Sequence, residues 1–231
     1  MDTKNFEERL KQYKNEFAPV VPLQKGDTLL LLDFTENNIE LTEEMLNDTQ
    51  LFSNYVNKKL IEAGAIYGIG GYNEHRTIYS RSPVFDSINT EDRRVHLGID
   101  IWGAPHTKVM APLNGIVHSF AFNNAYGDYG GTIILSHNLD GESFHTIYGH
   151  LSLNSIKNVQ EGEAIMKGDV LGEFGTPFDN GHWPPHLHFQ IIRDMEGMKG
   201  DYPGVCALSE REKYLANCPD ADLILGLEGR V

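Results

Sequence analysis

Two histidines lie one residue apart in the segment PPHLHFQII, which runs from Pro184 to Ile192 and is otherwise apolar. Side chains alternate between the two faces of a β-strand, so His186 and His188 share one face. Leu187 and Phe189 lie on the opposite face, which we expect to pack against a core. Imidazoles act as proton donors and acceptors near neutral pH and are common metal ligands. The pattern therefore predicts a strand with one apolar face and one face of potential ligands.

A second candidate pair lies in the segment HLGIDIW, where His96 and Asp100 have the same strand parity. In a fully extended strand their Cα atoms would lie ~13 Å apart, at about 3.3 Å per residue. This separation is close to the limit for two ligands of one ion, so we expect a bend, and Gly98 is the residue that permits it. Two imidazoles and one carboxylate are typical of zinc sites, and three protein ligands leave a fourth position for water.

A third element is TIYGHL, in which Tyr148 and His150 are predicted to share one face at the end of a strand. A pair of histidines on one strand is by itself more often structural, and a histidine four residues before an aspartate is common. The three segments together indicate a metal site more strongly than any one of them alone.

The order of these motifs resembles that of the lysostaphin/LytM-type zinc endopeptidases, which cut peptide bonds in bacterial peptidoglycan. The resemblance rests on His-x-x-x-Asp, then APLNGIV, then Tyr-x-His-Leu, then PHLHF, and it covers residues 94–192, under half of the chain. It implies a compact antiparallel β core with a groove over the metal. It also implies one zinc ion per chain, with the zinc ligands His96, Asp100 and His188.

The resemblance further implies that His150 and His186 are catalytic and lie beside the bound water without ligating the metal. Either could accept the proton of that water, and either could stabilise the oxyanion or protonate the leaving amine. Two departures affect substrate preference: His182 and Trp183 occupy the loop before PHLHF, and the link GAPHTKVMAP is longer than usual in the family.

Periodicity along the chain predicts a mainly β protein, a sandwich or barrel, with an α-containing N-terminal extension and a short mixed C-terminal tail. The resemblance implies that its core is compact, antiparallel and LytM-like (a sandwich or open barrel). We expect helices over residues 5–17, 42–64 and 209–218, a strand over 28–35, and a glycine-rich connection at YGIGGYN. These features divide the chain into an α-rich extension (1–70), a LytM-like zinc peptidase domain (71–195) and a tail (196–231).

Residues just upstream of the site form the segment GIGGYNEHRTIYSRS. One interpretation of Tyr72, Glu74, Arg76, Tyr79 and Arg81 is a groove wall or a clamp for a substrate carboxylate, since guanidinium groups bind carboxylates in a bidentate manner. The other interpretation, slightly favoured by the sequence, is an ordinary solvated connector.

Charge and composition exclude several classes of partner. The 231 residues include 19 Lys and Arg against 33 Asp and Glu, a net charge of −14, which argues against nucleic acid or an anionic membrane as partner. Cys206 and Cys218 are too few for a disulfide framework, although one bridge is possible. No signal peptide or spanning segment is visible, so we expect a cytoplasmic location, or export if the chain is a trimmed piece. The expected partner is a peptide or peptidoglycan substrate.

Three functions follow from the sequence. The first is a zinc metalloendopeptidase that acts on peptidoglycan-type cross-links, and the second is a non-catalytic LytM-like regulatory or binding module. The third is an intracellular zinc amide hydrolase that acts on another peptide, with residues 1–70 as a lid, an inhibitory segment or a docking element. The oligomeric state is not indicated.

Overall fold

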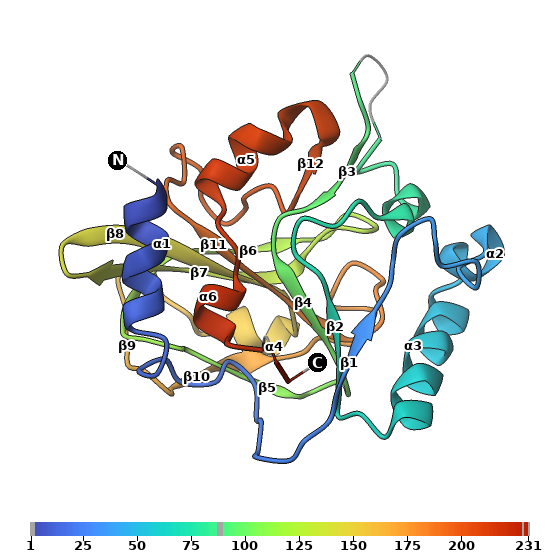
Figure 1. Ribbon diagram of the computed structural model, residues 1–231, viewed down its shortest axis with the longest axis horizontal. Helices are drawn as coiled ribbons and strands as arrows, with labels where there is room; N and C mark the ends of the chain where they lie inside the picture. The colour runs from blue at the N-terminus through green and yellow to red at the C-terminus, as the bar shows by residue number, and fades with distance from the viewer. Residues whose placement is uncertain (1–2, 87–89, 228, 231) are drawn as a thin grey trace.

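A computed structural model describes residues 3–86, 90–227 and 229–230, and Figure 1 shows its arrangement. One large sheet dominates, and its first two strands pair in parallel whereas its other neighbours pair in antiparallel fashion. The prediction of a mainly β, antiparallel core is therefore confirmed. Across the sheet the strands are β1 (Leu29–Leu32), β2 (Tyr67–Gly70), β4 (Ile99–Trp102), β11 (His186–Ile192), β8 (Glu142–Leu151), β7 (Gly130–Leu139), β6 (Gly115–Asn123) and β9 (Ala164–Ile165).

Two small sheets complete the β structure. They pair β10 (Val170–Glu173) with β5 (Lys108–Met110), and β12 (Val205–Ala207) with β3 (Arg93–His96). The second of these sheets matters for the site, because it fixes a C-terminal segment beside the strand that ends in His96. The short helices η1 (Thr77–Arg81) and α4 (Leu153–Ile156) lie in connections between strands.

The alternation predicted for β11 is present, but both of its faces are buried. Leu187 and Phe189 belong to the main hydrophobic core, as expected. His186 and His188 are only 2% and 3% exposed, because other segments cover the polar face. A polar face buried in this way requires a partner for each nitrogen atom, and these partners define the site.

The N-terminal helices begin and end at capping residues, but the helix predicted over 42–64 is in fact two helices. α2 (Glu43–Asn47) is capped by Thr42, whose side chain accepts a hydrogen bond from the backbone N–H of Met45. Asp48 interrupts the helix because its carboxylate accepts hydrogen bonds from two backbone N–H groups of the next turn and so caps α3 (Thr49–Ala63). Gly64 ends α3 with φ of 61°, as predicted. The first helix, α1, spans Thr3–Gln12.

The glycine-rich connection predicted at YGIGGYN is wrong in part, because Tyr67–Gly70 forms β2 inside the sheet. Glycine is required there by close packing: a Cβ atom on Gly68 would lie too close to the Leu32 side chain, and one on Gly70 would lie 2.7 Å from Arg76 Nη2. Glycine in a strand commonly marks such a close approach. Through β1 and β2, residues from the first 70 positions extend the same sheet that carries the site.

The C-terminal segment forms η2 (Leu208–Glu210), α5 (Arg211–Asn217) and α6 (Asp222–Leu225), so the predicted helix at 209–218 is confirmed. α1 and α6 contact each other over the main core (Figure 1). Cys206 and Cys218 are free thiols and both are buried. Within the described residues, no helix is long and apolar enough to cross a membrane.

Replacement of Phe52 by alanine tests whether α3 is integral to the fold. Phe52 is fully buried, and its ring contacts those of Phe34, Trp102 and Trp183 at centroid distances of 6.0, 5.9 and 6.3 Å. We expect Phe52→Ala to lower the free energy of unfolding by about 3–5 kcal/mol. The measurement is denaturant unfolding followed by tryptophan fluorescence, since both tryptophans lie outside residues 1–70.

The matched control is Leu51→Ala, which changes a half-exposed residue of the same helix and is expected to cost less than about 1 kcal/mol. An unchanged tryptophan transition in Phe52→Ala would show that the N-terminal segment unfolds independently.

Candidate metal and catalytic centre

Three side chains from separate segments converge at the centre of the molecule. His96 ends β3, Asp100 lies on β4, and His188 lies on β11 directly opposite Asp100 in the strand register. His96 Nε2 lies 3.0 Å from His188 Nδ1 and 3.2 Å from Asp100 Oδ1, and His188 Nδ1 lies 3.0 Å from Asp100 Oδ1. The chain bends between β3 and β4, as predicted from Gly98, where a Cβ atom would lie 2.6 Å from the Phe189 carbonyl oxygen.

The hydrogen bonds on the far side of each ring fix which atoms face the centre. His96 Nδ1 lies 2.9 Å from the Gly71 carbonyl oxygen, and His188 Nε2 lies 2.9 Å from Gln190 Oε1. Both oxygens can only accept, so these two ring nitrogens carry the protons. His96 Nε2 and His188 Nδ1 therefore direct lone pairs at each other and at a carboxylate oxygen.

Gln190 holds its oxygen toward His188 because its amide nitrogen donates to the Pro203 carbonyl and to Cys218 Sγ, both at 3.2 Å. The hydroxyl of Tyr129 lies 3.3 Å from the same ring nitrogen of His188. Sequence reasoning missed both contacts. Gln190 was detectable in principle, since it continues the i, i+2, i+4 parity of His186 and His188, but Tyr129 carried no comparable signal.

A single small cation fits this donor set. The three ligand atoms lie within 4.8 Å of one another, and atoms bound 2.0–2.1 Å from a tetrahedral zinc ion are separated by about 3.3 Å. Burial opposes ionisation of Asp100, but His96 and Arg76 outweigh it and hold the pKa of its carboxyl well below the usual 3.8. Burial, together with the charge of Arg76, lowers the pKa of His96 to about 4, so this imidazole is neutral at neutral pH.

Arg76 holds the carboxylate in place from behind. Its guanidinium is fully buried and donates to Asp100 Oδ2 at 2.5 Å, to Glu74 Oε2 at 2.7 Å and to the Gly71 carbonyl at 3.0 Å. Asp100 therefore has one oxygen occupied and turns the other toward the two imidazoles. The interpretation of this segment as a solvated connector is wrong, since Tyr79 and Arg81 are buried as well.

His150 and His186 lie beside the ligand group with their rings 4.0 Å apart. His150 Nδ1 lies 2.9 Å from the Asn180 carbonyl oxygen and His186 Nδ1 lies 2.8 Å from that of Pro184, so each donates from Nδ1 and keeps its lone pair on Nε2. Burial lowers the pKa of His186 to about 4, and burial with the neighbouring His186 holds the pKa of His150 well below 6.5. Both are neutral imidazoles that can accept a proton.

The prediction that Tyr148 and His150 share a face is wrong. Tyr148 packs in the main core against Phe189, whereas His150 turns toward His186. A register shift between β7 and β8 and the positive φ of His150, 63°, change the strand parity at this point. Backbone conformations of this kind are costly for a non-glycine residue and are common at functional sites.

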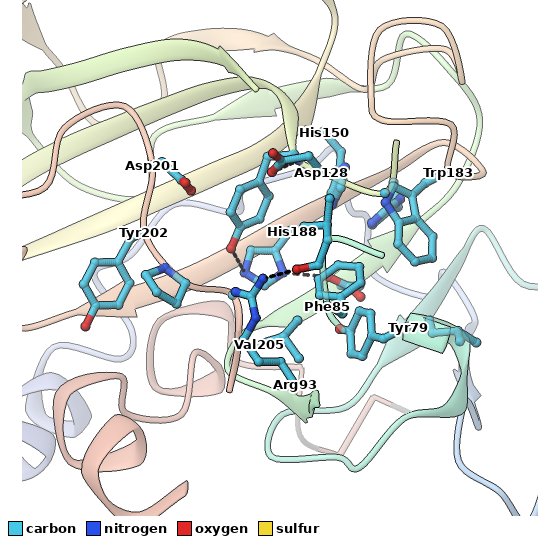
Figure 2. A pocket seen from close by; sticks show the side chains of 18 of the residues that line it. Tyr79, Phe85, Arg93, Asp128, His150, Trp183, His188, Asp201, Tyr202 and Val205 are labelled. Atoms are coloured by element: carbon cyan, nitrogen blue, oxygen red, sulfur yellow. Dashed lines mark hydrogen bonds and ion pairs between the residues drawn. The ribbon is translucent and has the colours of Figure 1, made fainter. Parts of the chain in front are cut away.

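Four of the five side chains, Asp100, His150, His186 and His188, line a cavity of about 130 Å³. Figure 2 shows Tyr79, Phe85 and Trp183 on one side and the segment with Asp201 and Tyr202 on the other. No residue of 1–70 that the structure describes lines this cavity, so a lid formed by the N-terminal segment has no support in this conformation.

The N-terminal segment instead supports the wall of the cavity through Arg81. The guanidinium of Arg81 lies 4.7 Å from the ring centroid of Trp183 and donates to Thr49 Oγ1 and to the Tyr126 hydroxyl at 3.0 and 2.8 Å. Thr49, the first residue of α3, also donates to the His182 carbonyl at 3.0 Å. The loop containing His182 and Trp183, which departs from the family pattern, is therefore held by α3.

Comparison with known proteins places the site within one matched region. Residues 94–200 match peptidase family M23, and this range includes all five histidine and aspartate side chains described above. The chain is 29% identical over 139 residues to a Haemophilus influenzae protein described as an uncharacterised metalloprotease, covering 57% of this chain and 27% of that protein. It is 30% identical over 125 residues to the L-Ala–D-Glu endopeptidase of Bacillus subtilis, covering 52% of this chain and 36% of that enzyme.

The chain thus spans about a quarter to a third of the length of these curated relatives. Among solved structures, the catalytic domain of lysostaphin from Staphylococcus simulans is 22% identical, with a TM-score of 0.41, and the match covers 70% of this chain and 97% of that domain.

Replacement of Gln190 tests whether its hydrogen bond fixes His188 in the tautomer that can bind a metal ion. In Gln190→Leu the ring nitrogen loses its acceptor and its tautomer is no longer fixed, so we expect affinity for a divalent metal to fall about 10–100-fold. Gln190→Glu keeps an acceptor at the same place and is expected to retain the affinity. Competition with a chromogenic chelator measures both, and equal affinity of Gln190→Leu and the unchanged protein would contradict this role.

Proposed function

Because the chain contains a domain of peptidase family M23, we propose that it is a zinc-dependent metallopeptidase that hydrolyses peptide bonds of the peptidoglycan type. One zinc ion per chain would be held by His96, Asp100 and His188, and His150 and His186 would be the catalytic residues. The observation that carries this proposal is the orientation of the three ligand atoms, whose lone pairs face one another in a buried site. Such an arrangement is unfavourable unless a cation lies between them.

A zinc ion bound there would supply a polarised carbonyl and an acidified water. His150 and His186 are suited to handle the protons of the reaction, since each is neutral and its Nδ1 is anchored to a backbone carbonyl. The free Nε2 of one can take a proton, and the other can stabilise the oxyanion or return a proton to the leaving amine. His186 is further fixed by stacking on Trp102, with ring centroids 3.9 Å apart.

The substrate class is supported by the relative from Bacillus subtilis, whose name describes cleavage between L-Ala and D-Glu. Since this chain covers only 36% of that enzyme, its substrates and its compartment stay part of the proposal. The division into an extension, a peptidase domain and a tail also stays a prediction. A non-catalytic module is less well supported, because all five side chains of the site are present and mutually oriented.

Metal content tests the ligand set. We expect the purified protein to hold about one zinc ion per chain and to lose it to a strong chelator. His188→Ala removes one of three ligands and is expected to abolish stoichiometric binding, as measured by atomic absorption after dialysis. His75→Ala, which changes an exposed histidine, serves as the control. Full zinc occupancy in His188→Ala would exclude this ligand assignment.

Turnover tests the two catalytic assignments separately. We expect His150→Ala and His186→Ala to keep zinc and to lose about 10²–10⁴-fold in kcat, the range typical of a positioned acid or base. Cleavage of short soluble peptides of the peptidoglycan type, followed by mass spectrometry, measures the loss. If His150→Ala turned over at the unchanged rate, its role as a proton acceptor would be ruled out.

A further inference from the structure

The walls of the cavity are built largely from residues outside the family match. Ile78, Tyr79, Val84, Phe85 and Arg93 come from the chain before residue 94, and a C-terminal strap formed by residues 201–205 supplies the opposite side. About half of the cavity lining therefore lies outside the matched region, including the charged side chains of Arg93 and Asp201.

The C-terminal strap lies directly against the site. β12 begins in the strap and pairs with β3, so that Val205 is opposite His96. The Gly204 carbonyl accepts a hydrogen bond from the backbone N–H of Leu97 at 2.9 Å. A Cβ atom on Gly204 would overlap the Tyr129 hydroxyl and lie 3.2 Å from His188 Nε2. The strap thus closes one side of the cavity down to the ligand residues.

Three charged side chains line this cavity in addition to the site itself: Arg93, Asp128 and Asp201. Figure 2 shows Arg93 on one side of His188 and the two aspartates on the other. Among the side chains that the structure describes, no ion pair joins Arg93 to either carboxylate. Arg93 donates to the Val84 carbonyl and its guanidinium lies 5.7 Å from the Phe85 ring centroid, which fixes its position. Burial raises the pKa of both Asp128 and Asp201.

We propose that this cavity selects short peptides with free ends, binding a substrate carboxylate at Arg93 and a substrate ammonium group at Asp128 and Asp201. The inference rests on the proposed peptidase function and specifies its substrate class. At about 130 Å³ the cavity is below the 300–1,000 Å³ usual for ligand pockets, so it accommodates a small peptide end rather than a long strand.

Charge complementarity supports the same conclusion. Arg93 and the two aspartates carry opposite charges, face one cavity and, among the described residues, form no ion pair with each other, so they are complementary to a ligand that carries both a negative and a positive group. Hydrogen bonds between ionised groups are also stronger than those between neutral groups. The backbone of an internal segment carries neither charge, whereas the two ends of a short peptide carry one of each sign. An internal segment would also have to pass the strap that closes one side of the cavity.

Binding of capped and uncapped peptides tests the proposal without requiring turnover. The probe is tetra-alanine in four forms: free, N-acetylated, C-amidated and doubly capped. Each is titrated by calorimetry into the zinc-loaded His150→Ala protein. We expect the free peptide to bind at least tenfold more tightly than the doubly capped one, since each lost ionic hydrogen bond lowers affinity by about that factor.

Variants assign each end to its partner. In Arg93→Gln, the free and the C-amidated peptide should bind equally well, whereas a free amine should still increase the affinity. In the double variant Asp128→Asn, Asp201→Asn, the free and the N-acetylated peptide should bind equally well, whereas a free carboxylate should still increase the affinity. Lys108→Gln and Glu212→Gln, which remove single charges from exposed residues outside the cavity lining, should preserve both advantages. Equal affinity for all four peptide forms, or no measurable binding of any form, would overturn the proposal.

Failure of this proposal can be distinguished from failure of the proposed peptidase function. Absence of zinc or of peptide hydrolysis would reject the peptidase assignment, whereas efficient hydrolysis of doubly capped or cross-linked peptides would reject only the selection of free ends.

Discussion

The site depends on one electrostatic constraint: two imidazole lone pairs and one carboxylate oxygen are held 3.0–3.2 Å apart in a buried place. Without a cation these atoms repel one another, and burial prevents water from screening the repulsion. The fold therefore has to impose the arrangement. It does so by giving the outward polar atoms of His96, Asp100 and His188 fixed partners in Gly71, Arg76 and Gln190.

Two of these three partners lie before residue 94, outside the region that matches the family. Gly71 directly follows β2, and Arg76 directly precedes η1. The segment between these two elements therefore supplies two of the three groups that orient the candidate ligands. Gly70 is needed for the same arrangement, since a side chain there would displace the Arg76 guanidinium. The chain before residue 94 thus supports the candidate metal site structurally, and through Arg81 and Thr49 it also supports a loop at the cavity wall.

His150, one of the two histidines proposed to be catalytic, is positioned by irregular backbone rather than by ideal strand geometry. His150 reaches the site only because the β7–β8 register shifts and its own φ is positive, a conformation that a β-branched residue would tolerate poorly. Regular alternation would have directed the ring into the core beside Tyr148. Local strain of this kind is stable here because the hydrogen bond from Nδ1 to the Asn180 carbonyl and the contact with His186 fix the side chain.

The sequence by itself determined the mainly β fold, the two-faced strand at His186–Ile192 and the bend at Gly98, because period-two alternation and the need for glycine are local properties. The five residues of the candidate site came from the resemblance of four motifs to one family, and alternation alone misplaced His150. Tertiary structure decided the rest. The sequence offered Arg76 as a clamp for a substrate carboxylate, whereas in the structure it binds Asp100. The segment around Tyr129 carries no chemical signal, and Asp48 divides a helix whose apolar periodicity is continuous. The cavity is closed on one side by the strap of residues 201–205. This closure arises from contacts between segments about a hundred residues apart, which periodicity within one element cannot encode.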